Sequence, residues 1–253
     1  MCLILFAYRV HPDYQLILAA NRDEFYERPT ARADWWDSDS NIFAGRDLKG
    51  GGTWMGVNRK GGFAAVTNYR EVPGEMAGAP TRGDLVADFL RKTDSPADYL
   101  ATLGQNADQY NGFNLIVGDQ QSLWYVSNRG EGAEALKPGV YGLSNHLLNT
   151  PWPKVEKGMR ELKHLIRSGN AWNRNLLFDM LSNAETAPDD TLPKTGVPLA
   201  WERILAPMFI RSKAYGTRVS TILLITENGE VSMEERAHVP EGKPVRIHFS
   251  TEL

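Results

Sequence analysis

Cys2 is the single cysteine of the chain, and it directly follows the initiator methionine. A residue as small as cysteine lets methionine aminopeptidase remove Met1, which exposes the α-amine of Cys2 next to its own thiol. An α-amine has an unperturbed pKa of about 7.7–8.0, so it can act as a general base at neutral pH. One residue would then supply both nucleophile and base, and we predict Cys2 to be an N-terminal nucleophile.

Cys2 also begins an apolar run, residues 3–8, which predicts a buried strand. A lone cysteine in such a strand is commonly a small core residue, and position alone favours that interpretation slightly. Other residues must decide between the two interpretations. They must lie at strand ends that the fold can bring to Cys2.

The tetrapeptide at residues 21–24 follows a second apolar run, residues 15–20. If the two runs pair as a hairpin, Arg22 and Asp23 lie beside Cys2. A guanidinium lowers the pKa of a nearby thiol, and a carboxylate can hold an ammonium group in place. The alternative is a solvated strand end with a local ion pair.

Three further polar residues lie at strand ends. Asn68 ends the strand predicted over residues 63–68, and Asn145 follows the strand predicted over residues 139–143. Two amides aimed at one point can form an oxyanion hole. Arg218 leads into an apolar strand, and its buried charge is expected to need a paired carboxylate.

The remaining pattern predicts a layered α+β protein, with residues 1–253 as one domain. Residues 219–226 and 230–237 flank an Asn-Gly turn, which is typical of a hairpin. We interpret residues 21–52 as irregular and residues 184–198 as a loop. Further strands are predicted at 53–58, 113–117, 123–127 and 245–249, and helices at 82–92, after Ser95, at 154–166 and at 173–181.

Composition excludes several classes of protein. One cysteine cannot form a disulfide within the chain, and it fits a cytoplasmic location. The net charge is −3 without a basic stripe, so nucleic acid is not expected as a partner. The five histidines are far apart in the sequence, so no metal site is predicted. The apolar amino terminus is too short for a transmembrane segment.

Several short motifs resemble those of the NRDE family, also called the transport and Golgi organisation family. They occur in order along most of the chain: Met1-Cys2, Asn21-Arg22-Asp23-Glu24, Gly51-Gly52-Thr53-Trp54, Thr67-Asn68-Tyr69-Arg70, Pro80-Thr81-Arg82-Gly83, Gly142-Leu143-Ser144-Asn145 and Gly216-Thr217-Arg218. The family is similar in turn to N-terminal-nucleophile hydrolases of the choloylglycine and penicillin V acylase type. The resemblance implies a four-layer αββα sandwich.

The same resemblance implies roles for individual residues. Asn68 corresponds to the oxyanion position of those hydrolases, Asn145 to their second active-site asparagine and Arg218 to their late arginine. Their early arginine and aspartate are three residues apart, whereas Arg22 and Asp23 are adjacent here.

Two functional hypotheses follow. In the first, Cys2 attacks the carbonyl of an amide in a small or lipid-like substrate, and no cofactor is required. In the second, which reflects the haem trafficking and lipid metabolism associated with the family, the same cleft binds haem or an acyl-CoA without reaction. Arg22, Arg28 or Arg46 would meet an anionic group of the ligand, and Cys2 or His146 would ligate iron. Trp35, Trp36, Trp54 and Tyr69 could line an apolar pocket. The alternative is that these aromatics are core residues, and for Trp54 we favour that alternative.

A third interpretation is a fold that serves only as a scaffold. A buried Cys2 with no cleft beside it would favour this interpretation. The oligomeric state is not predicted.

Overall fold

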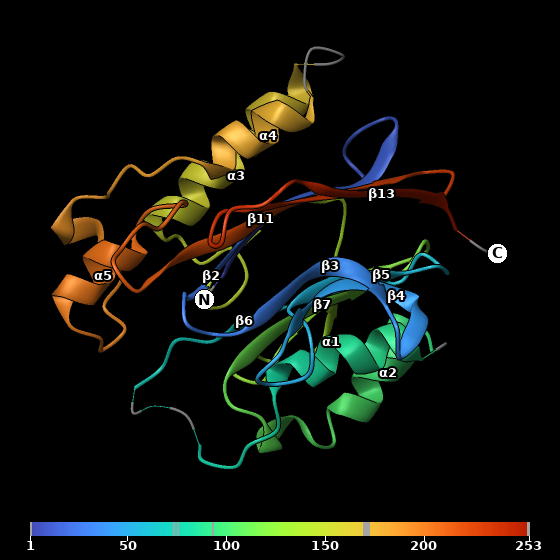
Figure 1. Cartoon of the computed structure of the whole chain (residues 1–253), viewed down its shortest axis with the longest axis horizontal. Coiled ribbons are helices and arrows are strands. Elements are labelled where there is room, and N and C mark those ends of the chain that lie inside the picture. Colours follow the sequence, from blue (N-terminus) through green and yellow to red (C-terminus); the bar gives the residue numbers. More distant parts are fainter. Residues whose placement is uncertain (1, 73, 75, 93, 169–172, 252–253) are drawn as a thin grey trace.

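The computed structural model describes residues 2–72, 74, 76–92, 94–168 and 173–251. Two antiparallel sheets lie face to face with helices on both outer sides (Figure 1). The layer order is helix, sheet, sheet, helix, which confirms the predicted αββα sandwich. Met1, whose removal the catalytic hypothesis needs, lies outside the described residues.

The first sheet has six strands in the order β10-β1-β2-β11-β12-β13, so the amino-terminal hairpin lies at its centre beside a strand from the carboxyl-terminal third. The strands are β1 (Cys2–Tyr8), β2 (Tyr14–Phe25), β10 (Gly139–Leu143), β11 (Tyr215–Thr226), β12 (Glu230–Ala237) and β13 (Val245–Ser250).

The second sheet has seven strands that follow one another in chain order. They are β3 (Thr30–Trp36), β4 (Asp39–Asp47), β5 (Met55–Asn58), β6 (Phe63–Asn68), β7 (Phe113–Gly118), β8 (Leu123–Ser127) and β9 (Glu134–Ala135).

Three apolar cores separate the layers. One joins the inner faces of the two sheets and contains Ile4 and Phe6 of β1. A second joins the outer face of the first sheet to α3 (Pro153–Arg167) and α4 (Arg174–Leu181). The third joins the second sheet to α1 (Arg82–Arg91) and α2 (Pro96–Leu103). Strand β1 is buried on both faces because each face meets a core, which explains its continuous apolar run.

Local signals placed several boundaries well. Ser95 is the N-cap of α2 with Pro96 at its first position, and Gly229 takes a φ of 84° in the turn between β11 and β12. The irregular interpretation of residues 21–52 was wrong. Strand β2 continues to Phe25, and β3 and β4 form most of the remainder, because ladder pairing with neighbouring strands stabilises them.

The short helix α5 (Leu199–Leu205) was also missed; it has only two turns, too few for an apolar period to show. Among the helices of the described residues, none combines the length and apolarity needed to cross a membrane.

The loop before β5 packs backbone against backbone on the start of α1. A Cβ atom on Gly52 would lie 2.6 Å from the carbonyl oxygen of Gly83 and 2.8 Å from the amide nitrogen of Asp84. Neighbouring Gly51 has a φ of 81° but open space around it.

We therefore expect Gly52→Ala to lower the free energy of unfolding by about 3 kcal/mol or more, because backbone atoms must shift. Gly51→Ala is the matched control and should cost only about 1–2 kcal/mol of left-handed strain. Urea denaturation of both variants measures the difference, and equal losses would contradict the close packing.

Candidate functional site

A cavity of about 640 Å³ has Cys2 in its wall. Strands β1, β2 and β6 each bring polar groups to it, and the loops around residues 49–54 and 79–83 complete it. Its lining includes Cys2, Arg22, Asp23, Glu24, Arg28, Arg46, Asp47, Lys49, Trp54, Asn68, Arg82 and Tyr215. Cys2 is buried but borders this cavity, so the combination that would favour the scaffold interpretation, a buried Cys2 with no cleft, is not found.

The register of β1 on β2 places Cys2 directly opposite Arg22. Residues opposite each other in an antiparallel pair lie on the same face of the sheet, so both side chains face the second sheet, as Ile4 and Phe6 do. Arg22 Nη1 donates to Thr30 Oγ1 at 3.4 Å. The hairpin thus brings the guanidinium to the thiol, as predicted.

Burial raises the pKa of the Cys2 thiol above its usual range, and the Asp23 carboxylate raises it further, whereas Arg22 lowers it. The carbonyl oxygen of Cys2 accepts a hydrogen bond from Ser144 Oγ at 3.1 Å, which fixes the start of β1. A thiol with a raised pKa is mostly protonated at neutral pH. Nucleophilic attack by Cys2 therefore requires a base.

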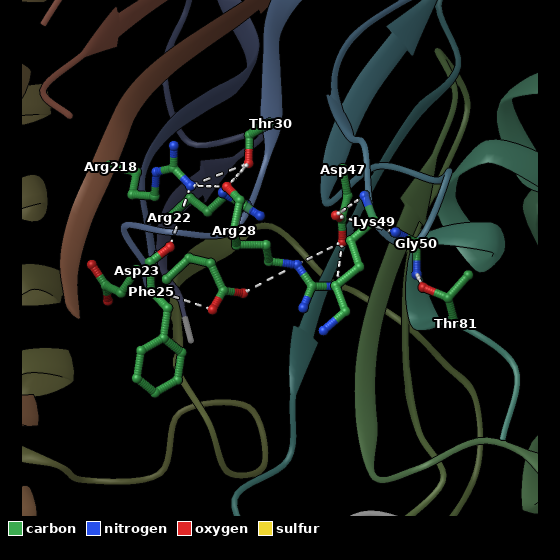
Figure 2. A network of polar contacts seen from close by, with 12 residues as sticks. Arg22, Asp23, Phe25, Arg28, Thr30, Asp47, Lys49, Gly50, Thr81 and Arg218 are labelled. Atoms are coloured by element: carbon green, nitrogen blue, oxygen red, sulfur yellow. Dashed lines mark hydrogen bonds and ion pairs between the residues drawn. The ribbon is translucent and has the colours of Figure 1, made fainter. Parts of the chain in front are cut away.

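Asp23 follows Arg22 and points to the opposite, helix-covered face, because side chains alternate along a strand (Figure 2). Its Oδ1 accepts from Thr217 Oγ1 at 2.6 Å, and its carbonyl oxygen accepts from the Tyr215 hydroxyl at 3.1 Å. Burial raises the pKa of this carboxyl, while the charge of Lys154 and the Thr217 hydrogen bond lower it. Of these adjacent residues, Arg22 therefore lies between the two sheets, and Asp23 lies between the first sheet and its helices.

Asn68 ends β6 and lines the same cavity as Cys2. Asn145 is fully buried, and its Nδ2 donates to the carbonyl oxygen of Asn68 at 2.9 Å. A smaller cavity of about 160 Å³, which also borders Asn68, contains Asn145 in its wall. The fold therefore brings both asparagines together, with the Asn145 amide holding the backbone of Asn68.

Arg218 is not among the residues that line the cavity with Cys2, but it contacts three of them, Phe25, Arg28 and Thr30. It occupies the bulge of β11 between Thr217 and Val219. Its guanidinium donates to the carbonyl oxygens of Val239, Phe25 and Arg28 and to Thr30 Oγ1. The expected carboxylate partner is replaced by backbone carbonyls, which close the turn after β2.

Charged pairs cover the mouth of the cavity. Arg28 donates to Asp47 through two nitrogens (Figure 2). Its Nε also lies 3.8 Å from Oε2 of Glu24, four residues earlier in the chain. The Asp47 carboxylate also accepts from the backbone of Lys49 and Gly50. These contacts hold the β4–β5 loop against the end of β2.

The aromatic lining predicted for a ligand pocket is only partly present. Trp54, for which a core position was favoured, lines the cavity and is only partly buried. Trp36 is buried against α1 with its Nε1 donating to Ala44, and Trp35 packs between the sheets. Tyr69 borders the smaller cavity instead.

His146 is already engaged at both ring nitrogens, by the Tyr69 hydroxyl at 2.8 Å and by Thr150 Oγ1 at 2.9 Å. Iron ligation by His146 would break one of these contacts. Among the described residues, no cluster of three or more histidine, cysteine or acidic side chains could hold a metal ion.

Two groups near the site were missed in the sequence. Lys154 is buried at the start of α3, and Arg70 forms a buried ion pair with Glu202 at 2.6 Å. The signal for Lys154 was its place on the same helical stripe as Gly158 and Leu162, four and eight residues further on.

The fold and the site together define a four-layer αββα protein whose first strand brings a cysteine to the wall of a charged cleft. Residues 1–240 match the family described as Transport and Golgi organisation 2. The chain belongs to this family, and the resemblance seen in its motifs is confirmed.

Relatives span nearly the whole chain. The mouse Transport and Golgi organization 2 homolog is 38% identical and aligns over 94% of this chain and 93% of its own length. The Drosophila melanogaster Transport and Golgi organization protein 2 is 30% identical and aligns over 100% of this chain and 99% of its own length.

Solved structures with a similar arrangement include a penicillin V acylase from Agrobacterium tumefaciens, with a TM-score of 0.45, 13% identity and coverage of 98% of this chain and 86% of the other. A mutant conjugated bile acid hydrolase from Clostridium perfringens has a TM-score of 0.48 and 9% identity, with coverage of 100% of this chain and 99% of the other.

The contacts of Arg218 lead to a stability prediction. Arg218→Met should lower the free energy of unfolding by about 3 kcal/mol, because three backbone carbonyl oxygens lose the charged donor that joins them. Arg203→Met removes an exposed guanidinium that pairs with Asp189 and is the matched control. Chemical denaturation should show a clear loss for the first variant and no measurable loss for the second. An unchanged midpoint for Arg218→Met would contradict the structural role.

Proposed function

We propose that this protein is a cysteine hydrolase of the N-terminal-nucleophile type, acting on the C–N bond of a small or lipid-like amide. The observation that carries the proposal is the position of Cys2, whose thiol lines a cavity opposite Arg22 and shares that cavity with Asn68. The raised pKa of the thiol fits this chemistry, since the reaction then needs the base that a free α-amine provides.

The reaction divides into two displacements. The α-amine of Cys2 takes the thiol proton while Sγ attacks the amide carbonyl, and the tetrahedral oxyanion accepts a hydrogen bond from the side chain of Asn68. The protonated α-amine then gives its proton to the leaving nitrogen, and the C–N bond breaks to leave an acyl-thioester on Cys2. Water, deprotonated by the same amine, hydrolyses the thioester and regenerates the thiol.

The remaining predicted residues support these steps. Arg22 favours the thiolate by its charge, and Asp23 holds the ammonium form of the amine. Asn145 keeps the backbone of Asn68 in place through its hydrogen bond. We assign Arg218 to the support of the turn after β2, because its contacts are with backbone carbonyls.

The test is Cys2→Ala in protein whose intact mass shows removal of Met1. A panel of chromogenic N-acyl amides should be hydrolysed by the wild type, and the variant should lose activity by at least ~10³-fold, since the nucleophile is gone. Asn68→Ala should lower kcat by ~10²–10³-fold and leave the thermal midpoint unchanged. Cys2→Ala protein that turns over the same substrates at the wild-type rate would exclude nucleophilic catalysis.

A second candidate function is supported by the charge of the cavity. Its lining includes five cations and two carboxylates: Arg22, Arg28, Arg46, Lys49 and Arg82 against Glu24 and Asp47. Asp23 also borders the cavity, but its carboxylate points into the helix-covered layer. We infer that an anionic ligand such as haem or an acyl-CoA can occupy the same cleft without reaction. Trp54 adds an aromatic surface to that cleft.

Titration with haem, followed by the Soret band, and with an acyl-CoA, followed by calorimetry, tests this candidate. Arg46→Met should weaken binding about tenfold or more, because a hydrogen bond between charged groups contributes roughly 1.5–3 kcal/mol. Arg59→Met, a cation stacked on Trp35 outside the cavity, is the control. No binding of either ligand at micromolar concentration would exclude the carrier.

A further inference from the structure

Lys154 is a buried lysine in the layer behind Cys2. It occupies the first turn of α3, where its side chain is 5% exposed, and it shares the buried face of that helix with Val155, Gly158 and Leu162. Its Nζ donates to the carbonyl oxygen of Leu205 at 2.9 Å. A buried ammonium group is costly unless a negative charge compensates it. The ammonium group of Lys154 is therefore expected to have a compensating carboxylate in the same layer.

Asp23 is the carboxylate that the topology supplies. Odd-numbered residues of β2 face the helices, as Ile17 and Ala19 do in the core beneath α3 and α4, so Asp23 projects into the layer that contains Lys154. Asp23 is 1% exposed. The two charges act on each other: Lys154 lowers the pKa of Asp23, and Asp23 raises that of Lys154.

Burial acts in the opposite direction on both groups. It raises the pKa of Asp23 and lowers the pKa of Lys154 to about 8. Each charge therefore favours the ionised form of the other in this layer.

Other charged and titratable groups face the same layer. Arg70 and Glu202 form their own ion pair at 2.6 Å, with Glu202 also accepting from Thr195. Tyr215 has a pKa raised well above its usual value by burial, so it is neutral. Arg70 and Arg22 also act on Asp23, but the charge of Lys154 has the largest lowering effect on the pKa of that carboxyl.

We propose that Lys154 is a positioning residue that keeps Asp23 ionised behind the amino end of Cys2, so that this carboxylate can hold the α-ammonium group. The inference rests on the proposed use of Cys2 as an N-terminal nucleophile. Asp23 follows the residue that pairs with Cys2, and thus lies level with the peptide nitrogen that becomes the free amine. Its carboxylate then lies between two cations, and the charge of Lys154 favours the neutral, basic form of the amine.

The experiment compares the thermal midpoints of Lys154→Met, Asp23→Asn and the double variant between pH 5 and pH 9. In Lys154→Met, Asp23 loses its cation and its folded-state pKa rises further above the unfolded value of about 3.9. The folded state then binds a proton that the unfolded state releases, so this variant should gain stability as the pH falls. In Asp23→Asn the buried lysine has a depressed pKa, and stability should instead rise with pH.

The double variant has neither titratable group, so its thermal midpoint should show neither the rise toward low pH of Lys154→Met nor the rise toward high pH of Asp23→Asn. Lys163→Met, an exposed lysine of the same helix, is the matched control and should follow the wild-type profile. Parallel profiles for Lys154→Met and the double variant would overturn the inference, because a lysine that only caps Leu205 has no effect on Asp23. Should Lys154→Met fail to fold, folding of the double variant supports the pair, and failure of both overturns it.

A second readout concerns Cys2 itself. In Met1-free protein, Lys154→Met and Asp23→Asn should change the rate of Cys2 alkylation by iodoacetamide by the same factor, and the double variant should change it no further. Alkylation unaffected by Lys154→Met but changed by Asp23→Asn would contradict the role of Lys154. None of these measurements uses a substrate. The coupling between Lys154 and Asp23 can therefore fail or hold whatever the Cys2→Ala test shows about hydrolytic activity.

Discussion

Strand β2 is covered on both faces, and this constraint shapes the whole site. Its inner face meets the second sheet and its outer face meets the helices, so each of its polar side chains needs a partner within its own layer. Arg22 finds Thr30 on one side, while Asp23 finds Thr217 on the other. A one-residue step along the strand thus places the group that tunes the thiol and the carboxylate that we propose to hold the amine on opposite faces.

The contacts around Cys2 come from segments that are far apart in the chain. Ser144 fixes the carbonyl of Cys2 and accepts at its own carbonyl from Thr67, while Asn145 fixes Asn68. These hydrogen bonds join the ends of β10, β1 and β6 across the two sheets. These hydrogen bonds satisfy buried polar groups and hold the ends of the three strands in one arrangement. A catalytic nucleophile needs a position fixed in this way.

Electrostatics at the site follow from burial. The Cys2 thiol and the Asp23 carboxyl both have raised pKa values, because water is largely excluded from their surroundings. In such surroundings a reactive thiolate needs a nearby base, and an ionised carboxylate needs a nearby cation. The α-amine and Lys154 are the groups that we propose for these two tasks. Elsewhere in the cleft, the partly buried pair of Arg28 and Asp47 holds a loop in place.

By itself, the sequence determined the strands with continuous apolar runs, the capped helices, the hairpin that brings Arg22 to Cys2, and the family. These features depend on local patterns or on motifs kept in order. Only the tertiary structure decided that residues 21–52 are largely strand, that Arg218 contacts backbone carbonyls at the edge of the cleft, and that Lys154 is buried at the start of α3. Each of these depends on which segments pack together, since ladder pairing, bulge position and burial arise from contacts between residues distant in the chain.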